Sequence, residues 1–242
     1  MLMREILSVH DLCFRFDEKI IFSNANLSVN DQEKVGLWGP NGSGKTTFFR
    51  LLTGLLKPTS GSVVFAGKII QTKEDLQRLR QKLGYVLQYA DDQLFFPEVI
   101  EDVAFGPLNL GLSREDAKKV AMESLQMVGM ADYADALSFK LSGGQKKLVA
   151  LASVLSMKPE MILFDEPTAG LDEPAIDRFI EIVHKLPIST IIISHDPLVL
   201  EKTCNSFYTI VNGKFERLKE GAVHTHRHVH PFGNIPHSHE VI

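Results

Sequence analysis

Residues Gly39 to Thr46 read GPNGSGKT, residues Leu141 to Gln145 read LSGGQ, and residues Met161 to Pro167 read MILFDEP. The first segment follows a short apolar run, Lys34 to Trp38, and leads into a predicted helix, Thr46 to Leu56. A glycine-rich turn between a strand and a helix presents backbone N–H groups to phosphate, and the helix N-terminus favours the negative charge. These three segments, in this order, determine the fold that we expect.

The glycine-rich segment predicts a nucleotide site. The amides of Gly42 to Thr46 form an anion nest, and Lys45 places a positive charge on the β and γ phosphates. The Thr46 hydroxyl is a suitable ligand for Mg²⁺, a hard cation that prefers oxygen. The predicted binding residues of this loop are Gly39, Pro40, Asn41, Gly42, Ser43, Gly44, Lys45, Thr46 and Thr47.

Two carboxylates end the apolar strand Met161 to Phe164. The Asp165 side chain emerges at the carboxyl edge of a parallel sheet, where it can hold magnesium directly or through water. The alternative is that Asp165 and Glu166 are two surface acids that merely follow a strand.

With LSGGQ between the other two motifs, the chain resembles the ATP-binding cassette (ABC) ATPases from Met3 to about Gly213. The resemblance implies an α/β fold: a P-loop NTPase (RecA-like) core with an antiparallel β subdomain and an inserted helical subdomain. It makes Glu166 the base that polarises the attacking water. Gln88, in GYVLQ, would reach magnesium and water, and His195, in TIIISHD, would hold the γ phosphate. The catalytic residues implied are Lys45, Gln88, Glu166 and His195, and the magnesium ligands are Thr46, Gln88 and Asp165.

The LSGGQ segment implies that two cassettes work together. By resemblance, Ser142, Gly143, Gly144 and Gln145 bind the γ phosphate held by the opposite subunit, with Asp172 at the dimer seam. ATP would then join a homodimer, or a heterodimer with a second ABC ATPase, and hydrolysis would release it. The chain departs from the family pattern at Leu148, where a basic residue is common, which leaves the local ion pairing open.

An aromatic side chain is expected against the adenine. Phe16 matches the family position for stacking on the base, and Phe14 is the rival. A stacking contact does not recognise the hydrogen-bonding groups of the base, so the site would discriminate only weakly between nucleotides.

Periodicity places further elements around these motifs. Ile6 to Val9, Cys13 to Phe16 and Gly61 to Lys68 predict a small antiparallel sheet. Ser113 predicts an N-cap for an amphipathic helix that stops at Gly129. Parallel strands are expected at Met161 to Phe164 and Thr190 to Ser194, with a helix from Glu173 to Lys185 between them. The predicted domains are an ATPase domain, residues 1–220, with its helical subdomain at about 89–157, and a histidine-rich tail, residues 221–242.

Composition excludes several partners and settings. The chain has 242 residues, 44% of them hydrophobic, and a formal net charge of -4, so no basic field favours nucleic acid. Its two cysteines, Cys13 and Cys204, form no CxxC pattern and suit a reducing compartment. No apolar run reaches the roughly 20 residues of a membrane span, and the N-terminus lacks a signal-peptide layout. Together with the absence of a span, the resemblance to ABC ATPases implies a peripheral protein on the cytoplasmic face of the cell membrane, whose partners are integral-membrane transmembrane and substrate-binding subunits.

The stretch Tyr89 to Leu112 resembles ATPase subunits of energy-coupling-factor (ECF) importers, particularly the cobalt and nickel branch. Acids in this stretch would receive arginines of a membrane partner, unless it is only a charged, solvated loop. Imidazole suits Ni²⁺ and Co²⁺, and the tail holds six of the nine histidines: His224, His226, His228, His230, His237 and His239. A solvated tail without metal remains the alternative.

Other functions fit parts of the sequence. An ECF ATPase for a vitamin or another micronutrient would carry the same motifs. A metal-insertion GTPase would use Thr72 to Asp75, which matches [NT]KxD by letter although it precedes the Asp165 strand. A metal-storing module with a vestigial P-loop and a non-transport ABC protein of repair or translation complete the alternatives.

Overall fold

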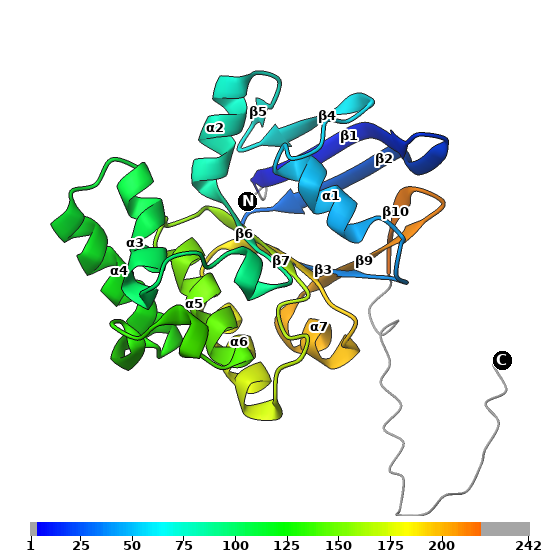
Figure 1. Cartoon of the computed structure of the whole chain (residues 1–242). Coiled ribbons are helices and arrows are strands. Elements are labelled where there is room, and N and C mark those ends of the chain that lie inside the picture. The colour runs from blue at the N-terminus through cyan, green and yellow to red at the C-terminus, as the bar shows by residue number, and fades with distance from the viewer. Residues whose placement is uncertain (1–3, 219–242) are drawn as a thin grey trace, which may run out of the picture.

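The computed structural model describes residues 4–218, and a six-stranded sheet with the order β10-β9-β3-β8-β7-β6 forms its centre (Figure 1). Five strands run parallel, and only the edge strand β10 pairs antiparallel, with β9. This order differs from chain order, so the connections cross over as in a doubly wound α/β fold. The strands are β3 (Lys34–Trp38), β6 (Leu83–Val86), β7 (Met161–Asp165), β8 (Ser189–Ile193), β9 (Ser206–Val211) and β10 (Lys214–Arg217).

Strand β7 shows how the sheet separates two cores. Met161 and Leu163 pack into one cluster, and Ile162 and Phe164 pack into the other. Side chains of a strand alternate between faces, and both faces of this sheet are covered, so the strand is an unbroken apolar run. The predicted parallel strands and the helix α6 (Glu173–Lys185) between them are confirmed within one residue.

A second, antiparallel sheet with the order β2-β1-β4-β5 lies over one face. Its strands are β1 (Glu5–Phe16), β2 (Lys19–Asn30), β4 (Ser60–Phe65) and β5 (Lys68–Ile69). The two predicted segments of the opening stretch are one strand, β1, which shifts register between Val9 and Leu12, where Asp11 has a φ of 47°. The predicted antiparallel sheet is thus confirmed, and it shares a core with helix α1 (Lys45–Leu52).

Helix α1 is shorter than predicted, because it ends at Leu52 and not at Leu56. Gly54 takes a φ of 67°, and the amides of Leu55 and Leu56 both bond back to the Arg50 carbonyl. Such a left-handed glycine closes a helix. The Arg80 guanidinium then donates to the freed carbonyls of Thr53 and Gly54, at 3.0 and 3.2 Å.

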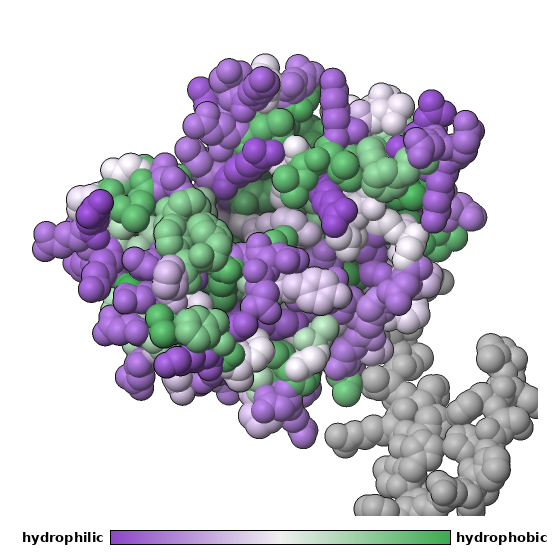
Figure 2. Space-filling model, viewed as in Figure 1, coloured by the Kyte–Doolittle hydropathy of each residue, from purple (hydrophilic) through white to green (hydrophobic). Residues whose placement is uncertain are grey.

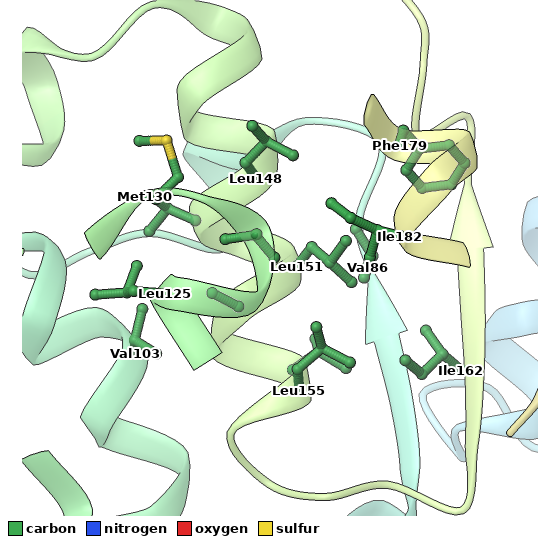
Figure 3. Packing of buried hydrophobic residues seen from close by; sticks show 14 of the residues in the cluster. Val86, Val103, Leu125, Met130, Leu148, Leu151, Leu155, Ile162, Phe179 and Ile182 are labelled. Atoms are coloured by element: carbon green, nitrogen blue, oxygen red, sulfur yellow. The ribbon is translucent and has the colours of Figure 1, made fainter. Parts of the chain in front are cut away.

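The inserted helices form a subdomain packed against the edge of the central sheet (Figures 1 and 3). They are α3 (Val99–Asn109), α4 (Arg114–Val128) and α5 (Gly143–Leu155). In α4, Ser113 is the N-cap and accepts from the Asp116 amide at 3.1 Å, while Gly129 closes the helix with a φ of 68°, as predicted. Figure 3 shows Val103 and Leu125 of α3 and α4 facing Leu151 and Leu155 of α5, which in turn meet the strands.

The remaining elements complete the layers. They are α2 (Lys73–Lys82), α7 (Pro197–Thr203) and the 3₁₀ turns η1 (Ala90–Asp92), η2 (Ala131–Tyr133) and η3 (Ser138–Lys140). Within residues 4–218, each helix is too short or too polar to cross a bilayer.

Candidate active site

The glycine-rich loop connects β3 to α1, as the sequence predicts. Gly44 is the N-cap of α1 with a φ of 105°, and a Cβ there would lie 2.7 Å from Cγ2 of Ile21. Only glycine combines this backbone conformation with this close approach. The loop amides are thereby fixed at a helix N-terminus, where an anion is favoured.

Lys45 brings a buried positive charge to this loop. The residue is 7% exposed, and its ammonium donates to the carbonyls of Gly39 and Pro40, at 2.7 and 3.0 Å. Burial lowers the pKa of Lys45, while Glu166 and Asp165 act against that shift. Lys45 forms no salt bridge within residues 4–218, so the charge suits a phosphate group that would balance it.

Asp165 lies beside Thr46 at the carboxyl end of β7. Oδ1 of Asp165 accepts from the Thr46 hydroxyl at 3.2 Å, and Oδ2 accepts from the Tyr85 hydroxyl at 3.1 Å. Burial raises the pKa of Asp165, and its two hydrogen bonds act in the opposite direction. A hydroxyl next to a buried carboxylate is an oxygen donor set that fits Mg²⁺. Sequence reasoning missed Tyr85, because only the pairing of β6 with β7 brings it to Asp165.

Glu166 follows directly and has a left-handed backbone, with a φ of 48°. Oε2 accepts from the His195 amide at 3.2 Å. Oε1 is buried, lies 3.4 Å from Nε2 of His195, and accepts no hydrogen bond within the described chain. Burial raises the pKa of Glu166, and His195 and Lys45 act against that shift. A desolvated carboxylate with a free oxygen at a pocket wall is equipped to accept a proton.

These groups surround one cavity of about 850 Å³. Eleven of the predicted residues line it: Phe16, Asn41, Gly42, Gly44, Lys45, Thr46, Thr47, Gln88, Asp165, Glu166 and His195. Gly39 and Pro40 do not line the cavity, but their carbonyls accept from the Lys45 ammonium. The buried Ser43 hydroxyl has no hydrogen-bond partner within the described chain. The structure therefore brings these eleven predicted residues together around one cavity.

Phe16 and Phe14 occupy different environments. Phe16 lines the cavity and is 45% exposed, whereas Phe14 is buried in the core. Their rings meet edge to face, with centroids 4.8 Å apart. Between the two, only Phe16 can offer a ring face to a bound base.

The LSGGQ residues lie in a separate groove. Ser142 is the N-cap of α5: its hydroxyl accepts from the Gln145 amide at 3.2 Å, and the Gln145 side chain accepts from the Ser142 amide at 2.9 Å. Asp172 lines the same groove and caps α6 by accepting from Ala175 N at 3.2 Å. Ser142 to Gln145 and Asp172 line this groove and not the phosphate cavity.

Leu148, at which the chain departs from the family pattern, follows two lysines that face different partners. Leu148 is buried, and the lysines before it take separate partners. Lys146 pairs with Asp91 at 2.5 Å. Lys147 donates to the carbonyls of Glu166 and Ala169, at 3.1 and 2.7 Å. Neither lysine was given a role by sequence reasoning.

Gln93 lies in the stretch that resembles the ECF importers, but sequence reasoning gave it no role in the site. Its side-chain oxygen accepts from the Leu87 amide at 3.1 Å, and its nitrogen donates to the Ala150 carbonyl at 2.8 Å. The segment that carries Gln88 is thereby tied to α5.

Two sequence features lie away from the cavity. Thr72 is the N-cap of α2, and Asp75 completes its capping box and pairs with Lys68 at 2.6 Å. The residues Thr72 to Asp75, which match the GTPase motif [NT]KxD by letter, thus cap helix α2. The tail histidines, His224 to His239, lie outside the described residues, and within residues 4–218 no three metal-binding side chains cluster.

The fold and cavity define a P-loop nucleotide-binding cassette. The family model described as ABC transporter matches residues 22–169, and the chain belongs to this family as an ABC transporter ATPase. It is 42% identical over 221 residues to the energy-coupling factor transporter ATP-binding protein EcfA of Methanocaldococcus jannaschii, covering 89% of this chain and 78% of that protein.

Solved structures agree with this assignment. CbiO1 of Clostridium perfringens, described as part of the ABC transporter complex CbiONQ, superimposes with a TM-score of 0.81 and 32% identity over 88% of this chain and 87% of that chain. A dimeric ATP-binding cassette in a post-hydrolysis state with ADP and Pi superimposes with a TM-score of 0.79 and 26% identity, over 88% and 99% of the two chains. The chain is thus an ABC ATPase of the energy-coupling-factor type.

Proposed function

We propose that this chain is the dimerising, ATP-hydrolysing subunit of an ECF-type importer for nickel or cobalt ions, attached to the cytoplasmic face of the cell membrane. The observation that carries the proposal is the convergence of Lys45, Asp165, Glu166 and His195 on one cavity, while Ser142 lies in another groove. A complete hydrolytic site then needs the groove of a second cassette.

In this proposal, each residue of the cavity has its own role in binding or hydrolysis. The loop amides and Lys45 bind the phosphates, and Phe16 stacks on the base. Thr46 and Asp165, with Gln88, would hold Mg²⁺, which when bound neutralises charge on the phosphate oxygens. Glu166 accepts a proton from the attacking water, and His195 orients the Glu166 carboxylate and contacts the γ phosphate.

The dimeric relative bound to ADP and Pi supports the two-cassette arrangement. Ser142, Gly143 and Gly144 at the start of α5 offer amides and a helix N-terminus to the nucleotide of the partner. Both a homodimer and a heterodimer with a second ABC ATPase satisfy this geometry.

An apolar patch supports attachment to membrane subunits. The rings of Phe95, Phe96 and Phe105 pack together, with centroids 4.8 to 5.5 Å apart, and Phe95 is 63% exposed. Figure 2 shows apolar side chains gathered on the side of the molecule where α3 lies. Exposed acids, Asp92 and Glu101, stand near this patch in the chain and would receive basic side chains of the partner.

The proposal of nickel or cobalt ions as the substrate rests on two features of the sequence. The stretch Tyr89 to Leu112 is similar to the cobalt and nickel branch, and imidazoles of the tail, residues 221–242, suit these ions. A vitamin or another micronutrient is the alternative substrate, and it would use the same ATPase.

The test is purification of the full-length chain from membranes, followed by identification of co-purifying membrane proteins and transport assays in vesicles. We expect ATP-dependent uptake of Ni²⁺ or Co²⁺ that E166Q abolishes. Uptake of a vitamin without metal would support the alternative substrate. Recovery without membrane partners would contradict the importer proposal.

Deletion of residues 221–242 tests the tail separately from the ATPase. Loss of metal binding with intact hydrolysis would assign metal binding to the tail.

A further inference from the structure

Lys147 joins the LSGGQ helix to the turn that carries Glu166. It lies in α5, two residues after Gln145, and its ammonium donates to the carbonyls of Glu166 and Ala169, at 3.1 and 2.7 Å. It is half-buried and forms no salt bridge within residues 4–218. Its charge is therefore directed at two backbone oxygens.

The turn that Lys147 contacts is under backbone strain. Glu166 has a φ of 48°, a region that is unfavourable for a residue with a side chain, so the surrounding contacts must hold it there. The Glu166 amide bonds to Ile193 O at 3.0 Å, and its carboxylate accepts from the His195 amide. The first contact comes from β8, and the second comes from His195, two residues after the end of β8.

Lys147 supplies a third point of attachment, and this one comes from the helical subdomain. The Glu166 carbonyl accepts from Lys147 and from the Ala169 amide, the latter at 3.2 Å. Hydrogen bonds from a charged donor are shorter and stronger than neutral ones. Removal of the ammonium would leave the Ala169 carbonyl without this donor and the turn without its link to α5.

We propose that Lys147 is a positioning residue for hydrolysis, which aims the Glu166 carboxylate into the phosphate cavity from the helix that LSGGQ begins. Leu148, which stands where the family commonly has a basic residue, is buried beside Leu171 and cannot make these bonds. The proposal rests on Glu166 acting as the general base.

The test uses K147M, which keeps the length of the side chain and removes its charge. K147R retains donors, and K146M is the matched control, because Lys146 lies on the same helix and pairs with Asp91 outside the cavity. Steady-state hydrolysis, ATP binding and thermal unfolding are measured for each full-length variant in the complex with which it co-purifies. If K147M fails to fold, K147Q replaces it, which removes the charge and shortens the side chain but keeps a polar NH₂ group.

We expect kcat of K147M to fall by about 100-fold, as for a misplaced catalytic group, with KM for ATP within about twofold of the wild-type value. K147R should recover most of the lost kcat, and K146M should match the wild type. In an E166Q background, K147M should cause no further loss, because both changes disable the same step.

Three results would overturn the inference: wild-type kcat in K147M, a raised KM with unchanged kcat, or an additive loss in the E166Q background. Wild-type hydrolysis in E166Q would instead remove Glu166 as the base, and the inference with it. An inactive E166Q beside a fully active K147M contradicts the role of Lys147 alone.

Discussion

The backbone amide of His195 donates to Oε2 of Glu166 over 3.2 Å, and Nε2 of His195 lies 3.4 Å from Oε1 of the same carboxylate. The two residues are 29 positions apart in the sequence. They meet because β7 and β8 are parallel neighbours, with Asp165 opposite Ile193, so the residues that follow each strand emerge at one sheet edge.

Replacing Glu166 by Gln should separate binding from turnover. The amide keeps the size of the side chain but cannot take a proton, so ATP should still bind while kcat falls by at least ~100-fold. Fluorescence of Trp38, the single tryptophan, which directly precedes the glycine-rich loop, can report nucleotide binding. E160Q is the control, because Glu160 pairs with Lys82 away from the cavity. Unchanged hydrolysis in E166Q would remove this residue from the mechanism.

The pH dependence follows from the raised pKa of Glu166. A base must be ionised, so kcat should decline on the acid side at a pH above the ordinary glutamate pKa of about 4.3. The stability of the fold depends on pH in the opposite direction to kcat. A raised pKa in the folded state means that this group contributes stability below its unfolded pKa, and that the contribution is lost as pH rises through the folded pKa.

The nucleotide-free E166Q variant should therefore be more stable than the wild type at neutral pH, by about 1 kcal/mol, because a buried charged oxygen without a hydrogen bond is removed. Thermal unfolding of both proteins between acid and neutral pH measures this difference. A less stable E166Q would show that the ionised carboxylate stabilises the fold.

Asp172 and Ser113 provide a matched pair of helix caps. Each accepts a hydrogen bond from a backbone amide, Asp172 at the start of α6 and Ser113 at the start of α4. D172A and S113A should each lower the free energy of unfolding by about 1 kcal/mol. Only D172A should weaken the ATP-dependent dimer, measured by sedimentation with hydrolysis blocked by E166Q. Equal dimerisation by both variants would argue against a place for Asp172 at the seam.

Asp102 connects the aromatic patch to the segment before LSGGQ. The buried carboxylate accepts from the amides of Phe95 and Phe96, at 2.8 and 3.0 Å, and from the Ser138 hydroxyl at 3.1 Å. D102A would leave three donors without a partner and should cost about 3 kcal/mol of stability. D132N, at an exposed position, should stay within about 0.5 kcal/mol of the wild type in chemical denaturation. A similarly small effect of D102A would show that water replaces the carboxylate.

Local signals predicted the ends of some elements. Ser113 and Gly129 mark the ends of α4 correctly, because a cap depends on residues within one turn. Strand β9, which reads SFYTIV, and strand β2 were not predicted, because their pairing partners decide their role. The end of α1 was misplaced by four residues, since the apolar pattern continues through Leu55 and Leu56 after Gly54 has closed the helix.

The sequence by itself determined the chemistry of the phosphate site. GPNGSGKT, Asp165, Glu166 and His195 each follow an apolar strand and predict a role at its end, and the glycines allow the loop a backbone conformation that other residues rarely adopt. Only the tertiary structure decided how Tyr85, Gln93 and Lys147 support that site, and that Phe16 rather than Phe14 lines the cavity. The hydrogen bonds from Tyr85 to Asp165, from Gln93 to Ala150 and from Lys147 to Glu166 join residues 19 to 80 positions apart. They arise because the sheet brings distant strand ends to one edge, and no local pattern encodes that approach.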